Sequence, residues 1–252
     1  MEKGSRPPGG GYPSGLRGVA AVGDPYCYLY AVVPGRKEGR IAGLRVGNRE
    51  LYRVGKRGLM AVVHRGEPGE PFARTEEEAL ERAWLHYRVV EEIRRRYSSV
   101  LPLAAGQALP GQPPEETVRR WLGENEPWIR ERLEFLRSRD EYRVEIRPGE
   151  EGDPEIPEAE GGRSYLARRA ARLSRQEARE KRWKERAERW VTLLGESGPV
   201  EAERRQGELL AFCLLPRSEA REILERLAEK AREERVELRW SGPRAPYTFA
   251  RP

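Results

Sequence analysis

The pattern of apolar and polar residues predicts several strands over about residues 26–64. Residues 26–33 are rich in aromatic and β-branched side chains, are apolar on both faces and end at Pro34-Gly35, a pattern typical of a central strand. Residues 50–54 and 59–64 form two further runs, and the four residues between them include two glycines, as a β-hairpin requires. We therefore expect a central strand and a neighbouring hairpin.

Helical spacing of apolar residues follows. Thr75-Glu76-Glu77-Glu78 is a capping box that opens a helix to about Tyr97. Residues 100–103 are a short apolar run, expected as an edge strand or an extended crossing. Prolines begin a second helix at 113–114 and separate it from a third that ends near residue 136. The inward face of the first helix is predicted as Leu80, Ala83, Trp84, Tyr87, Val90 and Tyr97.

The second half of the chain predicts a recognisable order of elements. Residues 141–147 alternate as a strand, Ser164 caps a long helix to about Leu194, and strands at 200–204 and 208–215 follow. A helix from Ser218 and a strand at 236–240 complete the series. Strand, helix, strand, strand, helix, strand is the split-βαβ order of a ferredoxin-like domain. The long helix should face inward with Leu166, Ala170, Leu173, Trp183, Ala187, Trp190 and Leu194.

These elements predict an α+β protein of two domains. Hydrophobic residues make up 37% of the chain and charged residues 36%, which favours two modest cores over one deep core. We expect a disordered Gly/Pro-rich tail over 1–24, an N-terminal α/β domain over 25–138 and a C-terminal ferredoxin-like domain over 139–241. The last of these contains a flexible acidic loop at 148–162. Tyr28, Tyr30 and Trp84 are predicted core residues.

The basic excess of the chain lies in one helix. Residues 163–190 contain eleven basic and four acidic side chains, a net charge of +7, against +6 for the whole chain. Three interpretations stand: a solvated helix partly neutralised by the acidic loop, a surface for an acidic protein partner, or a nucleic-acid surface. Trp183 and Trp190 lie a heptad apart, which indicates core packing or a partner-binding stripe. The candidate partner-binding residues are Arg168, Arg172, Arg175, Arg179 and Trp183.

Residue spacing indicates neither a catalytic site nor a bound cofactor or metal. His64 and His86 lack partners at ligand spacing, and no phosphate-binding loop, dinucleotide fingerprint or nucleophile elbow occurs. We expect Cys27 and Cys213 to be buried thiols. No apolar run approaches the roughly 20 residues that span a bilayer, and the first 24 residues do not form a secretory signal. The expectation is a soluble, cytoplasmic, non-enzymatic protein.

Several local strings, in this order, resemble the gas vesicle protein F/L family. They are YLYAVV at 28–33, LMAVV at 59–63, LHYRVVE at 85–91, VLP at 100–102, GRSYL at 162–166, AF at 211–212 and GPRAPYTF at 242–249. The resemblance covers about residue 26 to the end. The chain departs from the family where Leu103-Ala104-Ala105 replaces an Arg-Phe-Gly string and where Arg244-Ala245 replaces Trp-Pro.

The resemblance implies an accessory protein of gas vesicle assembly. Such a protein binds the small hydrophobic shell protein, other accessory proteins or both, keeping the shell protein soluble or joining an assembly complex. The family pairs an N-terminal α/β domain with a C-terminal ferredoxin-like domain, and residues 242–252 would pack on the former through Tyr247 and Phe249. The alternative is a basic RNA-binding module, although residues 208–215 lack the basic-Gly-aromatic pattern of such sheets.

Overall fold

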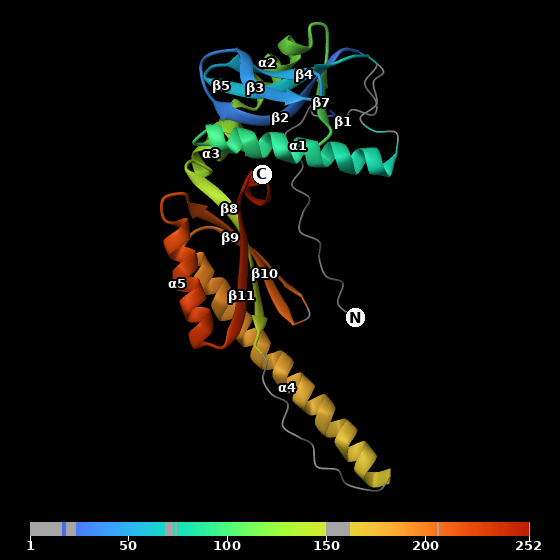
Figure 1. The fold of residues 1–252 in the computed structure, drawn as a ribbon, viewed down its shortest axis with the longest axis vertical. Coiled ribbons are helices and arrows are strands. Elements are labelled where there is room, and N and C mark those ends of the chain that lie inside the picture. Colours follow the sequence, from blue (N-terminus) through green and yellow to red (C-terminus); the bar gives the residue numbers. More distant parts are fainter. Residues whose placement is uncertain are drawn as a thin grey trace. The chain divides into compact units, whose positions relative to one another are not determined.

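The computed structural model describes residues 17–18, 24–68, 73, 75–149, 162–205 and 207–251, without the side chains of 17–18 and 162–168. It divides into two compact units (Figure 1). Unit 1 comprises Met1–Asp140 and Arg244–Pro252, and unit 2 comprises Glu141–Pro243. Both contain helices and a sheet, so the α+β prediction is confirmed.

Unit 1 contains a seven-stranded sheet in the order β1-β7-β2-β5-β4-β3, with β6 paired to β2. The central position of β2 and the β4–β5 hairpin are confirmed. Strands β3 and β7 were not predicted. Strand β3 carries two glycines and is mostly exposed, so it lacks the alternation of apolar and polar residues that marks a strand. The strands are β1 (Arg17–Gly18), β2 (Tyr26–Pro34), β3 (Gly39–Val46), β4 (Arg49–Lys56), β5 (Leu59–Gly66), β6 (Leu101–Pro102) and β7 (Gln107–Pro110).

Helices cover both faces of this sheet. Helix α1 (Glu76–Arg96) packs Val89, Val90 and Ile93 against the face that carries Tyr28 and Tyr30. On the other face, Cys27 contacts Tyr52, whose hydroxyl donates to Glu115 of α2 (Pro114–Glu124) at 2.9 Å. Helix α3 (Glu126–Phe135) follows directly, and a short 3₁₀ turn, η2 (Thr248–Ala250), lies near the C-terminus.

The predicted inward face of α1 is wrong in its N-terminal half. Thr75 caps the helix as expected, accepting from the Glu78 amide at 3.2 Å. However, no residue of α1 before His86 is buried, and Leu80, Trp84 and Tyr87 are exposed by 73%, 59% and 39%. Trp84 is therefore not a core residue, whereas Tyr28 and Tyr30 are. Periodicity identifies an apolar face but not how much of it a sheet covers.

Unit 2 has the predicted order of elements around a four-stranded sheet, β11-β8-β10-β9. Helix α4 begins at Gly162, so Ser164 lies inside the helix and not at its cap. The last strand is longer than predicted. The elements are β8 (Arg139–Pro148), α4 (Gly162–Gly195), β9 (Val200–Arg205), β10 (Glu208–Pro216), α5 (Ala220–Glu233) and β11 (Val236–Arg244).

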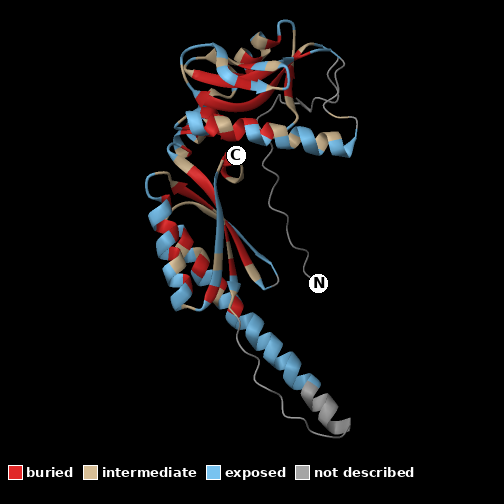
Figure 2. Ribbon diagram, viewed as in Figure 1, coloured by how far each residue is buried: buried red, intermediate tan, exposed pale blue. Residues whose placement is uncertain are grey.

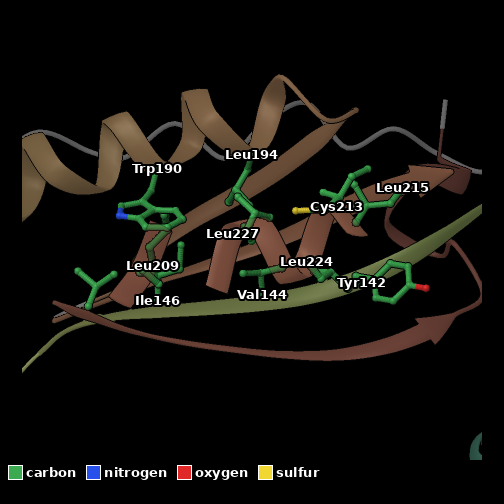
Figure 3. Close-up of a cluster of buried hydrophobic side chains, with 14 of the residues drawn as sticks. Tyr142, Val144, Ile146, Trp190, Leu194, Leu209, Cys213, Leu215, Leu224 and Leu227 are labelled. Carbon is green, nitrogen blue, oxygen red and sulfur yellow. The ribbon is translucent and has the colours of Figure 1, made fainter. Parts of the chain in front are cut away.

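The core of unit 2 is built from alternating strand residues and two helix faces (Figure 3). β8 contributes Tyr142, Val144 and Ile146, at the period of two that one strand face requires. They pack with Trp190, Leu194, Leu209, Cys213, Leu215, Leu224 and Leu227. Cys213 here and Cys27 in unit 1 are both buried free thiols, and burial raises their pKa values to about 12 and about 11.

Only the C-terminal part of α4 joins this core. Trp183, Ala187, Trp190 and Leu194 are buried as predicted. Ala170 and Leu173 are exposed, contrary to prediction, and the side chain of Leu166 is outside the description. All residues from 169 to 182 are exposed (Figure 2).

Two other predicted segments fall mostly outside the described residues. In the segment 1–24, Arg17 and Gly18 form β1 and pair with Ala108 and Gln107, which differs from the expected lack of regular structure there. The remainder of that segment, apart from Asp24, and residues 150–161 of the predicted acidic loop are not described. No helix in the described part of the chain has the length and apolarity to cross a membrane.

Candidate functional site

The predicted arginine cluster lies on the exposed half of α4. Arg172, Arg175 and Arg179 are all exposed, whereas the side chain of Arg168 is outside the description. Over residues 169–189, nine basic side chains stand against four acidic ones, a net charge of +5. An exposed helix with this charge attracts acidic surfaces over about 10 Å at ordinary ionic strength.

Trp183 does not belong to that cluster. Its side chain is only 8% exposed and packs in the core of unit 2 with Ala187 and Trp190. Core packing is therefore the role that its position supports, and we remove it from the candidate partner-binding residues.

A second exposed surface lies on α1 and was missed as such by sequence analysis. Leu80, Trp84 and Tyr87 follow one another at spacings of four and three residues, so they share one face of the helix. The Arg88 guanidinium lies 5.1 Å from the centre of the Trp84 ring. We call Leu80, Trp84 and Tyr87 the α1 stripe. Exposed aromatic residues beside an arginine are typical of the centre of a protein interface.

The C-terminal segment lies beside the α1 stripe within unit 1. The Ala245 amide donates to Glu91 of α1 at 2.5 Å. The Tyr247 ring lies 6.3 Å from the Tyr87 ring and roughly parallel to it, and Phe249 is buried. Glu91 also accepts from Arg94 at 2.8 Å, and Arg94 donates to Asp140 at 2.9 Å. The buried Glu91 thus holds the segment against α1.

Four rings form a buried cluster between β2, β5 and α1. Tyr28 hydrogen-bonds His86 and Tyr30 hydrogen-bonds His64, each with 2.9 Å between the tyrosine oxygen and Nδ1. Each tyrosine also stacks on the other histidine, with ring centres 5.0 Å apart for Tyr28–His64 and 5.1 Å for Tyr30–His86. We call Tyr28, Tyr30, His64 and His86 the ring cluster. Its strand residues share a face because β2 alternates, but only the tertiary structure supplies their partners.

The protonation of His86 follows from its contacts. Its Nε2 lies 2.9 Å from the Leu103 carbonyl oxygen, which can only accept, so Nε2 carries the hydrogen. Nδ1 then accepts from the Tyr28 hydroxyl. Burial lowers the pKa of His86 to about 4 and raises the pKa of Tyr28 to about 12. Both groups are therefore neutral at pH 7, and the hydrogen bond between them fixes the orientation of both rings.

The described residues contain no group of three or more His, Cys, Asp or Glu side chains arranged to hold a metal ion. Both histidines hydrogen-bond a tyrosine; His64 also contacts Arg49, and His86 also contacts the Leu103 carbonyl. The exposed α1 stripe and the exposed basic half of α4 are each suited to binding a partner.

Comparison with known proteins agrees with this architecture. Solved structures of two gas vesicle proteins are similar in fold to about nine-tenths of this chain. GvpF from Anabaena sp. PCC7120 has a TM-score of 0.60 and 18% identity, over 91% of this chain and 97% of its own. GvpF from Microcystis aeruginosa has a TM-score of 0.63 and 17% identity, over 90% of this chain and 99% of its own. No protein of curated function matches. The family model "Gas vesicle synthesis protein GvpL/GvpF" matches residues 26–251, and the chain therefore belongs to the GvpL/GvpF family.

Proposed function

We propose that this protein acts in gas vesicle assembly by binding the small hydrophobic shell protein, other accessory proteins or both, without catalysis. Membership of the GvpL/GvpF family implies the role in assembly. The observation that carries the binding proposal is the α1 stripe, since a contiguous exposed patch of apolar and aromatic side chains often marks an interaction site. We further propose that it acts in the cytoplasm, at the growing vesicle.

Unit 1 is the proposed docking domain and the basic half of α4 the proposed steering element. A positively charged helix raises the association rate with an acidic partner more than it raises the final affinity. Arg172, Arg175 and Arg179 lie on the exposed part of α4, where substitutions disturb no core. The two roles are therefore separable by mutation.

We also propose that unit 2 is a ferredoxin-like domain and that the two units are separate domains with the tail 242–252 belonging largely to the first. The support is the sheet order β11-β8-β10-β9 with two helices between its strands. A further support is that Arg244–Pro252 groups with unit 1 when the chain is divided into compact units.

The test is co-expression with the small gas vesicle shell protein, followed by measurement of soluble and co-purified shell protein. We expect the shell protein to remain soluble and to co-purify. The double variant Leu80→Ser, Trp84→Ser should reduce capture at least about tenfold, because central aromatic residues dominate interface energies. Trp240→Ser is the matched control, since Trp240 is an exposed tryptophan (43%) of unit 2.

Charge reversal tests the steering role. Arg172→Glu, Arg175→Glu and Arg179→Glu together should slow association at low salt and make little difference at high salt. The matched control reverses Arg226, Arg232 and Arg239, which are exposed on other elements of unit 2 and change the net charge equally. If both triple variants slow association alike, overall charge and not the helix is responsible.

The co-expression experiment with the shell protein also tests the RNA-binding alternative. Shell protein that aggregates as it does alone, together with nucleic acid absorbance on the purified chain, would refute shell-protein binding. Steep salt dependence of binding to single-stranded RNA would then be expected.

A further inference from the structure

A pocket of about 430 Å³ opens beside the ring cluster in unit 1. Its walls come from β2, β5, the turn between β3 and β4, and the first half of α1. This volume is within the range of sites that bind small ligands, which are typically apolar with a few convergent polar groups. The lining residues are Tyr26, Tyr28, Tyr30, Val46, Gly47, Asn48, Arg49, His64, Glu81, Arg82, Leu85 and His86.

The floor of the pocket is aromatic and depends on a glycine. Tyr26, Tyr28 and Tyr30 point to one face of β2, and all three are buried. A Cβ atom on Gly66 would lie 2.0 Å from the Tyr26 ring, so only glycine at this position lets that ring lie over β5. The resulting surface suits a flat apolar body.

The two tyrosine hydroxyls of the ring cluster differ in their hydrogen bonding. The Tyr28 hydroxyl donates to His86 and accepts from the Gly106 amide at 2.9 Å, so its proton and a lone pair are both used. It therefore needs nothing from a ligand.

The Tyr30 hydroxyl retains an unused proton. The Arg49 guanidinium can only donate, and its Nη1 lies 3.3 Å from Nε2 of His64, so Nε2 accepts. The hydrogen of the neutral imidazole is then on Nδ1 and is donated to the Tyr30 oxygen. Among the described residues, the Tyr30 hydroxyl has no second partner that could accept its own proton. At 2% exposure an unmatched donor costs free energy, which an acceptor in the pocket would recover.

The lining of the pocket beside the Tyr30 hydroxyl carries a net positive charge. Arg49 and Arg82 line the pocket and Glu81 is the acidic residue among the lining side chains, so the lining carries a net charge of +1. Burial raises the pKa of Tyr30 above its usual range, which keeps the hydroxyl protonated. A hydroxyl donor beside arginine matches the two acceptor oxygens of a carboxylate.

We propose that this pocket binds a carboxylate carried on a flat, apolar body, with the carboxylate accepting from Tyr30 and lying against Arg49 and the body resting on the tyrosine floor. The carboxylate arrives either on a free small molecule or as an acidic side chain of a bound protein. The inference uses unit 1 alone and does not depend on shell-protein binding.

The experiment uses benzoate as the probe and the full chain as the receptor. Saturation-transfer NMR and a titration of aromatic ring signals should detect benzoate binding, with benzyl alcohol as the uncharged control that binds at least about tenfold more weakly. Tyr30→Phe should weaken benzoate binding about tenfold while keeping the ring. Tyr52→Phe is the matched control and should leave benzoate affinity within about twofold, because Tyr52 does not line the pocket and its hydroxyl donates to Glu115 on the other face of the sheet.

Arg49→Gln is the second variant if Tyr30→Phe folds poorly, and Arg40→Gln on β3 is its control, since Arg40 is exposed and does not line the pocket. Arg49→Gln should weaken benzoate binding and Arg40→Gln should not. Absence of benzoate binding at millimolar concentration, or equal affinity in wild type and both pocket variants, overturns the proposal.

Shell-protein capture then separates the two sources of the carboxylate. If benzoate and Tyr30→Phe both reduce capture while Trp84 is intact, the pocket receives an acidic side chain of the partner. If benzoate binds but capture is unchanged, the ligand is a free small molecule. If capture itself never occurs, the benzoate titration still tests the pocket by itself.

Discussion

The interiors of the two units differ in the polar groups that they bury. Unit 1 buries six polar or charged side chains among its described residues, and unit 2 buries Glu141 at its boundary. The hydrophobic clusters of both units consist mainly of buried aliphatic and aromatic side chains. The six side chains of unit 1 are His64, His86, Glu91, Arg94, Ser99 and Asp140.

Buried polar groups in unit 1 favour one specific arrangement of segments that are distant in the sequence. Arg94 joins Glu91 of its own helix to Asp140 at the start of β8, and Glu91 also accepts from the C-terminal segment. A buried ion pair adds little net stability over an apolar replacement, but breaking one leaves a costly unpaired charge. The network therefore penalises wrong arrangements of three distant segments. The described residues of unit 2 pack mainly through apolar side chains, with a strand period of two and a buried helix face, and the Arg147–Glu208 ion pair between β8 and β10 is partly exposed.

Each unit has a single cysteine, buried and free, so thiol labelling during urea unfolding reports on each unit separately. Peptides containing Cys27 report on unit 1 and those containing Cys213 on unit 2. This readout avoids assigning one free energy to a chain of two units.

Arg94→Met should have the largest effect. It leaves Glu91 and Asp140 buried without their cation and should destabilise unit 1 by about 3–5 kcal/mol. Labelling of Cys27 should shift to lower urea while labelling of Cys213 does not. Arg95→Met is the control, because the Arg95–Glu92 pair is exposed and contributes no more than about 1 kcal/mol. An equal shift in the urea dependence of labelling at both cysteines would contradict the expectation that the two units unfold independently.

Leu194→Ala should destabilise unit 2 by about 3 kcal/mol, through lost apolar burial and the cavity left near Trp190. Labelling of Cys213 should move to lower urea in this variant. Leu173→Ala on the exposed half of the same helix is the matched control and should change stability by less than about 0.5 kcal/mol. Equal effects of the two substitutions would mean that the first half of α4 is covered by a partner in solution.

Acid should distinguish the units, because both histidines of the chain are in unit 1. The pKa of His86 is about 4 in the folded state and about 6.5 when unfolded, so the unfolded chain binds more protons between these values. Unit 1 should therefore lose stability as the pH falls from 6.5 toward 4, by at most about 1.4 kcal/mol per pH unit.

The measurement compares labelling of Cys27 and Cys213 between pH 6.5 and 5, where most carboxylates stay charged. His86→Gln preserves a donor for the Leu103 carbonyl and should flatten the slope for unit 1. An unchanged slope in His86→Gln would assign the pH dependence to other groups.

Trp84→Ser should have the smallest effect on stability, within about 0.5 kcal/mol, because Trp84 contributes to neither core. Its effect should appear only in partner capture. Trp240→Ser again serves as the control. Loss of Cys27 protection in Trp84→Ser would show that the α1 stripe is part of the fold and not of an interface.

Much of the fold was predictable from local pattern. The central strand at Tyr26–Pro34, the β4–β5 hairpin, the Thr75 cap and the element order of unit 2 follow from periodicity, capping chemistry and turn residues, all of which act over a few neighbouring residues. The candidate site was less predictable. Arg172, Arg175 and Arg179 of α4 are exposed as a partner surface requires, but Trp183 is core and the α1 stripe was expected to be buried.

The sequence by itself determined the family, the α+β class and the apolar strands and helix faces from which both cores are drawn. Only the tertiary structure decided which turns of α1 and α4 are covered, because coverage depends on where a sheet ends and not on the helix. It also decided the pairing of Tyr28 with His86 and of Tyr30 with His64, between residues 58 and 34 positions apart. Hydrogen bonds between residues so far apart in the sequence leave no local pattern, because each partner lies in a segment that looks like an ordinary strand or helix.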